Sequence, residues 1–467
     1  MRAPRILVVP GGTQVGAVAM AYASLHKLVE LHDEAGDAEG RTTPPHTVVV
    51  LRDPANVDRT TLRGALTTPA LALPELPPEV LADPHLFDGI DLVVPTSGST
   101  AGVPRLVGLS TDALIASARA TEKTLSGPGT WILALPAHHI GGAQVLFRAA
   151  LAGTSPQIVD TSAGFDPEAL LPAIAGATRD PSVPAYLSVV PVQLRTCLAA
   201  GPEVVEALGR LSAVLVGGSG LDPVLRASAE GLGVPIVATY GMTETAGGCV
   251  YDGVPLPGTT VRTIDNDGHS RLAISGPTLM TKYLGADAPF IDEAGRRWLL
   301  TGDIGVITAA GQVEVLGRSD EVIVSGGLSI APAPVRHAVL SAPGVRDAWV
   351  IGLPDPKWDS ALTAVVVPDP ALGIDTSVHA GPLPAHDPTT SAAHEGEPGT
   401  PDAPSPAMTS FGREVRDHVG GLLGRRQAPR IVVALPALPL LDSGKIDRRR
   451  LRAEVDARIG TDAEWRR

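Results

Sequence analysis

Short apolar runs alternate with segments of helical period through the first half of the chain. Four runs end in turn residues and are typical of buried strands: Asp91 to Pro95, Trp131 to Leu135, Tyr186 to Val190 and Ala213 to Val216. Between them, Thr111 to Thr124 and Pro223 to Leu232 repeat Ala and Leu with helical spacing. Strands that alternate with helices predict an α/β fold built from helix-covered sheets.

The pattern changes at about Leu256. Short alternating strands with Gly and Asp turns follow, at Val261 to Ile264, Arg271 to Ile274 and Gln312 to Leu316, and predict a β-rich subdomain. Near the end of the sequence, Phe411 to Leu423 and Ile446 to Ile459 have helical character.

The stretch from Pro368 to Pro406 differs from everything around it. It contains nine prolines and almost no large apolar side chains. Such a segment cannot offset the entropy lost on ordering by burying apolar surface. We therefore expect a disordered insertion.

Composition narrows the class of protein. At roughly 150 residues per domain, 467 residues predict two or three domains. The net charge of −13 argues against a general nucleic-acid binder. Two cysteines make no disulfide framework, the apolar run near Met1 is too short for a signal peptide, and no run reaches the roughly 20 apolar residues that span a bilayer. A cytoplasmic enzyme is the expectation; the sequence is compatible with a homodimer but does not fix the assembly.

A loop rich in Ser, Thr and Gly follows the strand that ends at Pro95. Its small residues let the main chain approach a polyphosphate, and its hydroxyls and N–H groups can donate to phosphate oxygens. Arg105 adds a positive charge at its end. The alternative is an ordinary surface loop. The candidate phosphate-binding residues are Thr96, Ser97, Gly98, Ser99, Thr100, Gly102 and Arg105.

Two acidic residues lie in similarly small-residue surroundings. Glu244, between Thr243 and Thr245, can bind a phosphate-bridging Mg²⁺. Its alternative is a helix N-terminus with Thr243 as the cap. Asp303, between two glycines at an expected strand end, can accept hydrogen bonds from ribose hydroxyls, or else belongs to an ordinary turn.

Three further motifs follow toward the C-terminus. They are Gly317-Arg318-Ser319-Asp320, then Gly326-Gly327, then Gly444-Lys445. The chain has five lysines among its 37 basic residues, and Lys445 is one of them. A lone lysine in a loop is usually just solvated, so Lys445 is a candidate only because it lies in the Gly444-Lys445 motif.

Taken in order, these motifs resemble the adenylate-forming superfamily of acyl-CoA synthetases, adenylation domains and luciferases. The resemblance runs from about Asp91 to Arg452. It implies a large N-terminal domain, residues 1–317, and a small α+β C-terminal domain, residues 318–467, that contains the insertion at 368–406 and rotates about a hinge at Asp320. It also implies ATP, Mg²⁺ and coenzyme A as ligands.

The same resemblance implies roles for individual residues. Glu244 matches the magnesium-associated carboxylate, and Lys445 matches the catalytic lysine of adenylation. Asp303 and Arg318 match the ribose contacts. The segments on the adenine side contain Gly218, Ser219, Tyr240, Gly241 and Thr243, and Gly326 and Gly327 match the loop that lines the pantetheine tunnel.

Other segments bear on the acid that is activated. His139 lies in a Pro-x-x-His-x-x-Gly segment and is either a gate residue near the acyl site or a structural histidine. The stretches from Ser188 to Leu194 and from Gly247 to Leu256 resemble the short actinobacterial form of o-succinylbenzoate–CoA ligase, a menaquinone-pathway branch of the family. Its substrate is a dianion, and the candidate donors to the distal carboxylate are Ser188, Arg195, Ser219 and Thr243.

Two departures from the family pattern leave other functions open. The phosphate loop has an additional residue, Ala101, and carries Arg105 where the family has lysine. Arginine brings a planar fork of donors in place of a point charge. The alternatives are another aryl- or acyl-CoA ligase, or a non-catalytic nucleotide or acyl-ligand binder. A peptide-synthetase adenylation domain is disfavoured because no carrier-protein serine motif follows Lys445.

Overall fold

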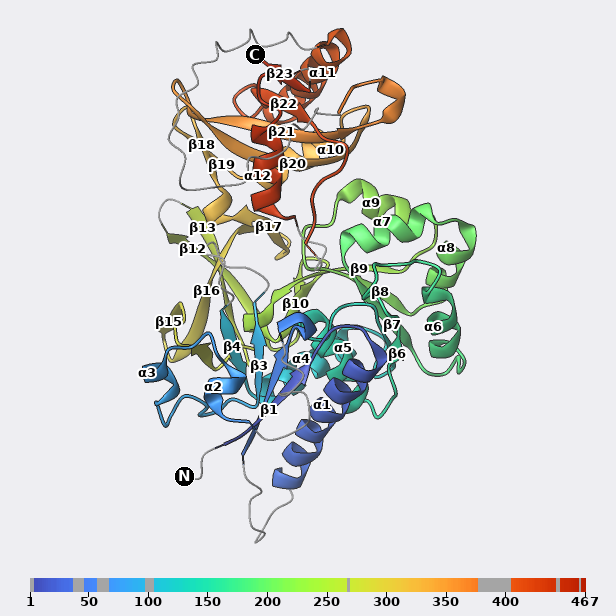
Figure 1. Cartoon of the computed structure of the whole chain (residues 1–467), viewed down its shortest axis with the longest axis vertical. Coiled ribbons are helices and arrows are strands. Elements are labelled where there is room, and N and C mark those ends of the chain that lie inside the picture. The colour runs from blue at the N-terminus through green and yellow to red at the C-terminus, as the bar shows by residue number, and fades with distance from the viewer. Residues whose placement is uncertain are drawn as a thin grey trace, which may run out of the picture. The chain divides into compact units, whose positions relative to one another are not determined.

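The computed structural model describes residues 4–36, 46–56, 67–96, 105–266, 269–376, 405–441, 446–461 and 463–467. The chain divides into two compact units, Met1–Val315 and Leu316–Arg467 (Figure 1). Each unit has its own apolar core and is described separately.

A five-stranded sheet in the first unit carries the strands on either side of the predicted phosphate loop. Its order is β1-β2-β3-β4-β14. The first three strands are parallel, whereas β4 pairs antiparallel with both β3 and β14. Its strands are β1 (Arg5–Pro10), β2 (Thr47–Arg52), β3 (Leu92–Pro95), β4 (Leu106–Leu109) and β14 (Lys282–Leu284), and the connections contain α1 (Val15–Gly36), the 3-10 turn η1 (Pro54–Asn56), α2 (Pro69–Ala72) and α3 (Pro78–Leu81).

A seven-stranded sheet forms the centre of the first unit, in the order β11-β10-β9-β8-β7-β5-β6. Neighbouring strands from β6 to β9 are parallel, and β10 and β11 are antiparallel additions at one edge. The strands are β5 (Thr130–Leu133), β6 (Gln157–Ile158), β7 (Ala185–Val189), β8 (Ala213–Val216), β9 (Ile236–Met242), β10 (Gly247–Tyr251) and β11 (Val254–Pro255), with the 3-10 turn η2 (Thr243–Thr245) between β9 and β10. The helices are α4 (Thr111–Thr124), α5 (Ile140–Leu151), α6 (Leu170–Ala177), α7 (Pro191–Ala199), α8 (Pro202–Gly209) and α9 (Pro223–Gly231).

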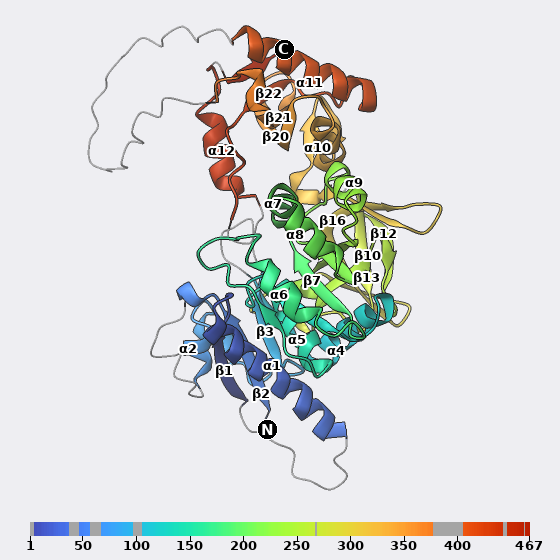
Figure 2. The same cartoon turned by 90° about the vertical axis from the view of Figure 1, so that its right-hand side faces the viewer.

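Helices cover both faces of this sheet because successive strand residues point to opposite sides. Trp131 and Leu133 of β5 pack into a core with α1, α4 and α5. Ile132, between them, packs into a second core with α6, α7 and α8. Figure 2 shows α6 and α8 side by side on that second face. The predicted helix-covered α/β sheet is confirmed.

The β-rich part of the first unit is an antiparallel sheet in the order β12-β13-β16-β15, with β17 paired to β16. It confirms the change of pattern expected after Leu256. Its strands are β12 (Thr260–Asn266), β13 (His269–Ser275), β15 (Phe290–Glu293), β16 (Arg296–Ile307) and β17 (Val313–Arg318).

The second unit is an α+β sandwich around a six-stranded sheet, ordered β19-β18-β21-β22-β23 with β20 paired to β21. Val335 of α10 and Val415 of α11 are fully buried against Val366 of β21. The elements are the 3-10 turn η3 (Ser319–Glu321), β18 (Ile323–Ser325), β19 (Leu328–Ile330), α10 (Pro332–Leu340), β20 (Val345–Asp355), β21 (Asp359–Pro368), the 3-10 turn η4 (Pro370–Leu372), α11 (Pro406–Leu423), β22 (Ile431–Ala434), α12 (Arg448–Asp456) and β23 (Glu464–Arg466).

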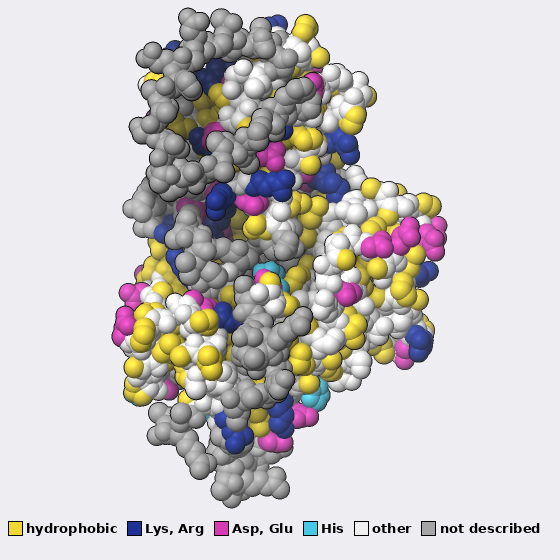
Figure 3. Space-filling model, viewed as in Figure 1, with side chains coloured by type: hydrophobic (Ala, Val, Ile, Leu, Met, Phe, Trp, Pro, Cys, Tyr) yellow, Lys and Arg dark blue, Asp and Glu magenta, His cyan; other side chains and the backbone are white. Residues whose placement is uncertain are grey.

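Two further expectations concern the surface and the insertion. Of the stretch expected to be disordered, residues 377–404 lie outside the described residues, and Pro370–Leu372 forms one 3-10 turn. Among the described helices, none is long and apolar enough to cross a membrane. Figure 3 shows acidic and basic side chains interspersed on the visible face of the described residues.

Candidate functional site

Several of the predicted site residues lie at the carboxyl-terminal end of the seven-stranded sheet. Because β5, β7, β8 and β9 are parallel, their carboxyl ends lie along one edge. Open α/β sheets bind ligands at such an edge. The predicted residues at or just beyond these strand ends are His139, Ser188, Ser219 and Tyr240.

β3 and β4 lead into and out of the predicted phosphate loop. The Thr96 N–H donates to the Arg105 carbonyl at 2.8 Å, and the Arg105 N–H donates to Thr96 Oγ1 at 3.0 Å. The two ends of the loop are therefore fixed to each other beside β14. The loop residues themselves lie outside the described part of the chain: Ser97, Gly98, Ser99, Thr100, Ala101 and Gly102.

Glu244 is held on both its main chain and its side chain. Its Oε1 accepts a hydrogen bond from the Tyr283 hydroxyl at 2.7 Å, and its carbonyl accepts from the Met280 N–H at 2.8 Å. The alternative of a helix capped by Thr243 is wrong. The segment makes a single 3-10 turn and then enters β10.

Ala246 closes that turn in the left-handed region, with φ of 50°. Its carbonyl accepts from Ser117 Oγ of α4 at 2.9 Å and from Gln144 Nε2 of α5 at 2.7 Å. Ser117 is fully buried and Gln144 nearly so. Two helices thus hold the main chain that presents Glu244.

Tyr283 connects Glu244 to the base of the phosphate loop. The guanidinium carbon of Arg105 lies 5.5 Å from the centre of the Tyr283 ring. Burial of Tyr283, followed by the charge of Glu244, raises the pKa of its phenol, while Arg105 acts in the opposite direction. The phenol therefore keeps its proton and donates a hydrogen bond to the carboxylate.

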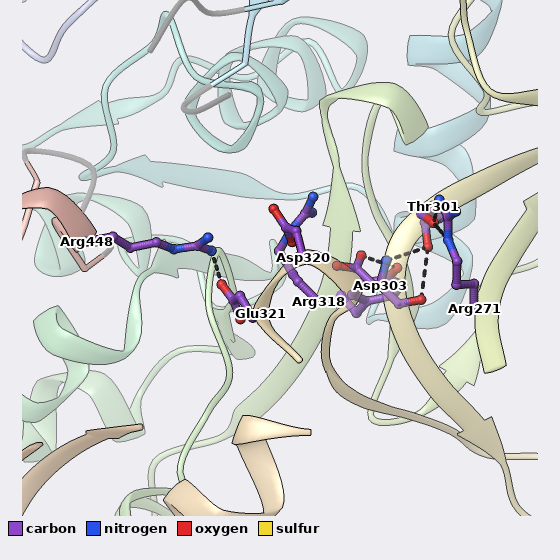
Figure 4. Close-up of polar contacts among 8 residues, drawn as sticks. Arg271, Thr301, Asp303, Arg318, Asp320, Glu321 and Arg448 are labelled. Carbon is purple, nitrogen blue, oxygen red and sulfur yellow. Dashed lines mark hydrogen bonds and ion pairs between the residues drawn. The ribbon is translucent and has the colours of Figure 1, made fainter. Parts of the chain in front are cut away.

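Asp303 is buried within β16 (Figure 4). Its Oδ2 accepts from the Tyr240 hydroxyl at 2.7 Å, and its N–H donates to Thr301 Oγ1 at 3.1 Å. Arg271 Nε and Nη2 donate to the Thr301 carbonyl at 2.8 and 2.6 Å. The expected strand end is wrong, because β16 continues to Ile307 after Asp303. Burial and then the Asp303 charge raise the pKa of Tyr240 well above its usual value.

The two neighbouring histidines differ in burial. His138 is buried, and its Nδ1 accepts from the Gly12 N–H at 3.1 Å, so a neutral ring carries its proton on Nε2. His139 is partly exposed, precedes α5, and lies with its ring centre 4.4 Å from that of His138. Of the pair, His138 is the more buried and His139 the more exposed.

The candidate acid-binding and adenine-side residues differ in accessibility. Ser188 and Thr243 are buried, Arg195 is half-buried on α7, and Ser219 is exposed after β8. Gly218, also exposed, has φ of 82°. Gly241 has no room for a side chain, because a Cβ there would lie 2.1 Å from the Gly247 carbonyl oxygen.

The second unit contains the remaining candidates. Arg318 Nε donates to Asp320 Oδ1 at 3.0 Å, and Arg448, on the first turn of α12, forms an ion pair with Glu321 (Figure 4). Gly326 and Gly327 form the turn between β18 and β19 with φ of 58° and 78°. A Cβ on Gly326 would lie 2.7 Å from the Trp358 ring. Lys445 lies outside the described residues.

Sequence reasoning missed the residues that hold the carboxylates. Tyr283 lies in a three-residue strand that has no distinctive pattern, and Ser117 and Gln144 lie inside helices α4 and α5, where no sequence motif marks them. Tyr240 was expected only as an adenine-side residue. No group of three or more His, Cys, Asp or Glu side chains among the described residues could hold a metal ion.

Comparisons with known proteins place this geometry in context. Residues 13–284 match the model of the AMP-binding enzyme family. The probable 2-succinylbenzoate–CoA ligase of Mycobacterium tuberculosis H37Rv is 36% identical over 379 residues, which cover 80% of this chain and 87% of that one. A 2-succinylbenzoate–CoA ligase of Bacillus licheniformis is 31% identical over 306 residues, 61% of each chain.

Solved structures share the fold. The o-succinylbenzoate CoA synthetase of Bacillus subtilis in complex with its acyl-adenylate intermediate matches with a TM-score of 0.63 at 21% identity, over 97% of this chain and 96% of that one. ATP-bound MatB of Rhodopseudomonas palustris matches with a TM-score of 0.66 at 21% identity, over 99% and 98%.

Proposed function

The chain belongs to the AMP-binding enzyme family, and we propose that it ligates o-succinylbenzoate to coenzyme A through an acyl-adenylate, as a step of menaquinone biosynthesis. The observation that carries the proposal is the 36% identity to the probable ligase of M. tuberculosis over 80% of this chain. The resemblance expected from the ordered motifs is confirmed at the level of the family.

The proposed chemistry has two half-reactions. A carboxylate is a poor acylating agent, so it first attacks the α-phosphate of ATP to give an acyl-adenylate and pyrophosphate. The thiol of coenzyme A then attacks the acyl carbonyl and releases AMP. Positioning and stabilisation of charge supply most of the rate in such a transfer.

The described residues fit a nucleotide with its metal. Mg²⁺ uses one or two carboxylates and takes its other ligands from phosphates and water. Glu244 offers such a carboxylate: Oε1 accepts from a neutral phenol, so the negative charge is retained. The metal would neutralise charge on the triphosphate. Asp303, with Oδ2 held by Tyr240, would accept from the ribose hydroxyls.

The acid is proposed to bind at the sheet edge that carries His139 and Ser188. Ser188 lies near the carboxyl end of β7, and His139 lies beyond the end of the neighbouring parallel strand β5, directly before α5. Arg195, on the helix that follows β7, and Ser219, in the segment after β8, are proposed donors to its distal carboxylate. A dianionic acid needs such donors because an unpaired charge is costly to bury.

A direct assay tests the substrate. Wild-type protein with o-succinylbenzoate, ATP, Mg²⁺ and coenzyme A should release pyrophosphate and form the thioester in equal amounts. Benzoate and hexanoate are the matched acids that lack the second carboxylate. Good turnover with either of these, and none with o-succinylbenzoate, would assign the chain to another aryl- or acyl-CoA ligase.

The role proposed for Lys445 separates the two half-reactions. Lys445→Ala should reduce o-succinylbenzoate-dependent ATP–pyrophosphate exchange by at least about 100-fold, since a charge contact made in the transition state is lost. Thioester formation from supplied acyl-adenylate should stay within about threefold of wild type. Equal loss in both assays contradicts the assignment.

Domain organisation and location remain proposals. We propose that the small domain rotates about Asp320 between the half-reactions, since one site then serves two reactions with different walls. We place the enzyme in the cytoplasm, the compartment that supplies ATP and coenzyme A. The homodimer stays a prediction.

A further inference from the structure

Tyr283 contacts two residues that the proposed function assigns to the triphosphate and its metal. Its hydroxyl donates to Glu244 Oε1 at 2.7 Å, and its ring lies under the Arg105 guanidinium at 5.5 Å. Tyr283 is only 6% exposed, so water competes little for its hydroxyl, whereas Arg105 is exposed. One buried side chain thus joins the carboxylate to the end of the phosphate loop.

Main-chain hydrogen bonds fix Tyr283 in this place. β14 pairs antiparallel with β4, with Tyr283 opposite Val107, two residues after Arg105. The Thr281 N–H adds a further bond to β4, to the Gly108 carbonyl at 2.9 Å, whereas the Met280 N–H donates to the Glu244 carbonyl. The segment therefore runs between the two elements that its tyrosine joins.

A phenol suits this position better than a cation would. A lysine or arginine paired with Glu244 would cancel its charge and compete with Mg²⁺, whereas a neutral O–H orients the carboxylate and leaves the charge for the metal. Among the ion pairs of the described residues, none joins Arg105 to Glu244. The guanidinium lies over the ring, an arrangement its planar shape favours.

We propose that Tyr283 is a positioning residue for adenylation, which orients the Glu244 carboxylate toward the metal–triphosphate and seats Arg105 beside the phosphate loop. The proposal rests on the proposed function. It also bears on a departure from the family pattern, because the guanidinium of Arg105, where the family has lysine, lies over the Tyr283 ring.

Tyr283→Phe tests the proposal because it removes the hydroxyl and keeps the ring. The metal concentration that gives half-maximal ATP–pyrophosphate exchange should rise about tenfold, the effect of one hydrogen bond to a charged group. Thioester formation from supplied acyl-adenylate should change less than twofold. Binding of Mn²⁺ with a non-hydrolysable ATP analogue, followed by electron paramagnetic resonance, should weaken by a similar factor without any turnover.

Tyr186→Phe is the matched control. Tyr186 is also a buried tyrosine, and its hydroxyl donates to the Gly127 carbonyl at 2.8 Å, away from Glu244. It should lower the thermal midpoint by about as much as Tyr283→Phe and leave metal dependence unchanged. If both variants shift only the thermal midpoint, Tyr283 is structural and the proposal fails.

A double-mutant cycle covers the case in which Tyr283→Phe is strongly destabilised. In a Glu244→Gln background, Tyr283→Phe should weaken Mn²⁺–nucleotide binding less than twofold further, because the interaction is already lost. A full tenfold additional loss would show that Tyr283 does not act through Glu244. Failure of the substrate assignment is seen separately, as absence of o-succinylbenzoate-dependent exchange in wild-type protein, while Mn²⁺ binding still reports on Tyr283.

Discussion

The two carboxylates proposed for the nucleotide, Glu244 and Asp303, are each held by a tyrosine hydroxyl at 2.7 Å, but their main chains are framed differently. Asp303 lies inside the 12-residue strand β16, and a neighbour two positions away, Thr301, satisfies its N–H. Glu244 lies in one 3-10 turn that ends in a left-handed alanine, Ala246. The first lies where the register of β16 with β13 shifts, and a threonine of the same strand accepts its N–H. Side chains from distant elements hold the second.

This difference predicts how each site responds to mutation. The pairing of β16 with β13 resumes at Ile304, next to Asp303, so the backbone there should survive the change of one side chain. Losses at Asp303 should then be confined to the nucleotide contact and its tyrosine. A single turn held by individual hydrogen bonds has fewer redundant supports, so changes far from Glu244 in sequence should reach it. Mutations that separate ATP affinity from metal dependence test this distinction.

The largest effect is expected at Asp303. Asp303→Ala removes the proposed ribose acceptor and leaves the hydroxyl of the partly buried Tyr240 without the carboxylate to which it donates. We expect kcat/KM for ATP in pyrophosphate exchange to fall about 100-fold, and the free energy of unfolding to fall by about 1–3 kcal/mol. Exchange kinetics and urea unfolding measure the two effects.

Asp303→Asn is the control for that variant. Its amide oxygen can still accept from Tyr240, so most of the stability should return while ATP affinity stays low. If Asn restores both quantities, the negative charge has no part in ATP binding and the ribose assignment is wrong.

Tyr240→Phe should have a smaller effect, which is confined to KM for ATP. It removes the donor to Asp303, and a hydrogen bond to a charged group contributes about 1.5–3 kcal/mol. Part of this returns when the ribose occupies the site, so we expect KM for ATP to rise about tenfold, with half-maximal metal concentration unchanged. The decisive comparison is with Tyr283→Phe. If the two variants need the same metal concentration for half-maximal exchange, Tyr240 and Tyr283 do not serve separate ribose and metal sites.

The regular helices and strands of the first unit could be largely predicted from the sequence. The runs at Ala213–Val216 and Thr111–Thr124 become β8 and α4 with the same bounds, since their patterns are strong and local. The β-rich subdomain that contains Asp303 is also predicted by the short alternating strands after Leu256. The strand end was misplaced because Gly302 and Gly305 suggested a turn, whereas both residues continue β16.

The support of Glu244 could not be predicted in the same way. A threonine before an acidic residue is typical of a helix start, and only Ala246 with φ of 50° followed by Gly247 with φ of 102° turns the chain into β10 instead. Tyr283 meets Glu244 through the pairing of a three-residue strand with a distant one. Such pairing depends on tertiary packing, for which short segments hold little information.

The smallest effect tests whether the turn of Glu244 depends on α4. Ser117→Ala removes one of the two donors to the Ala246 carbonyl, and Gln144 Nε2 remains at 2.7 Å. Since the acceptor stays satisfied, the free energy of unfolding should fall by only about 1 kcal/mol, and half-maximal metal concentration should rise about twofold. Thr124→Ala on the same helix removes a hydroxyl bonded within the helix, to the Ala120 carbonyl, and should change metal dependence by nothing measurable. If Ser117→Ala matches this control in urea unfolding and metal titration, α4 does not support the turn, and the frame of Glu244 is as local as that of Asp303.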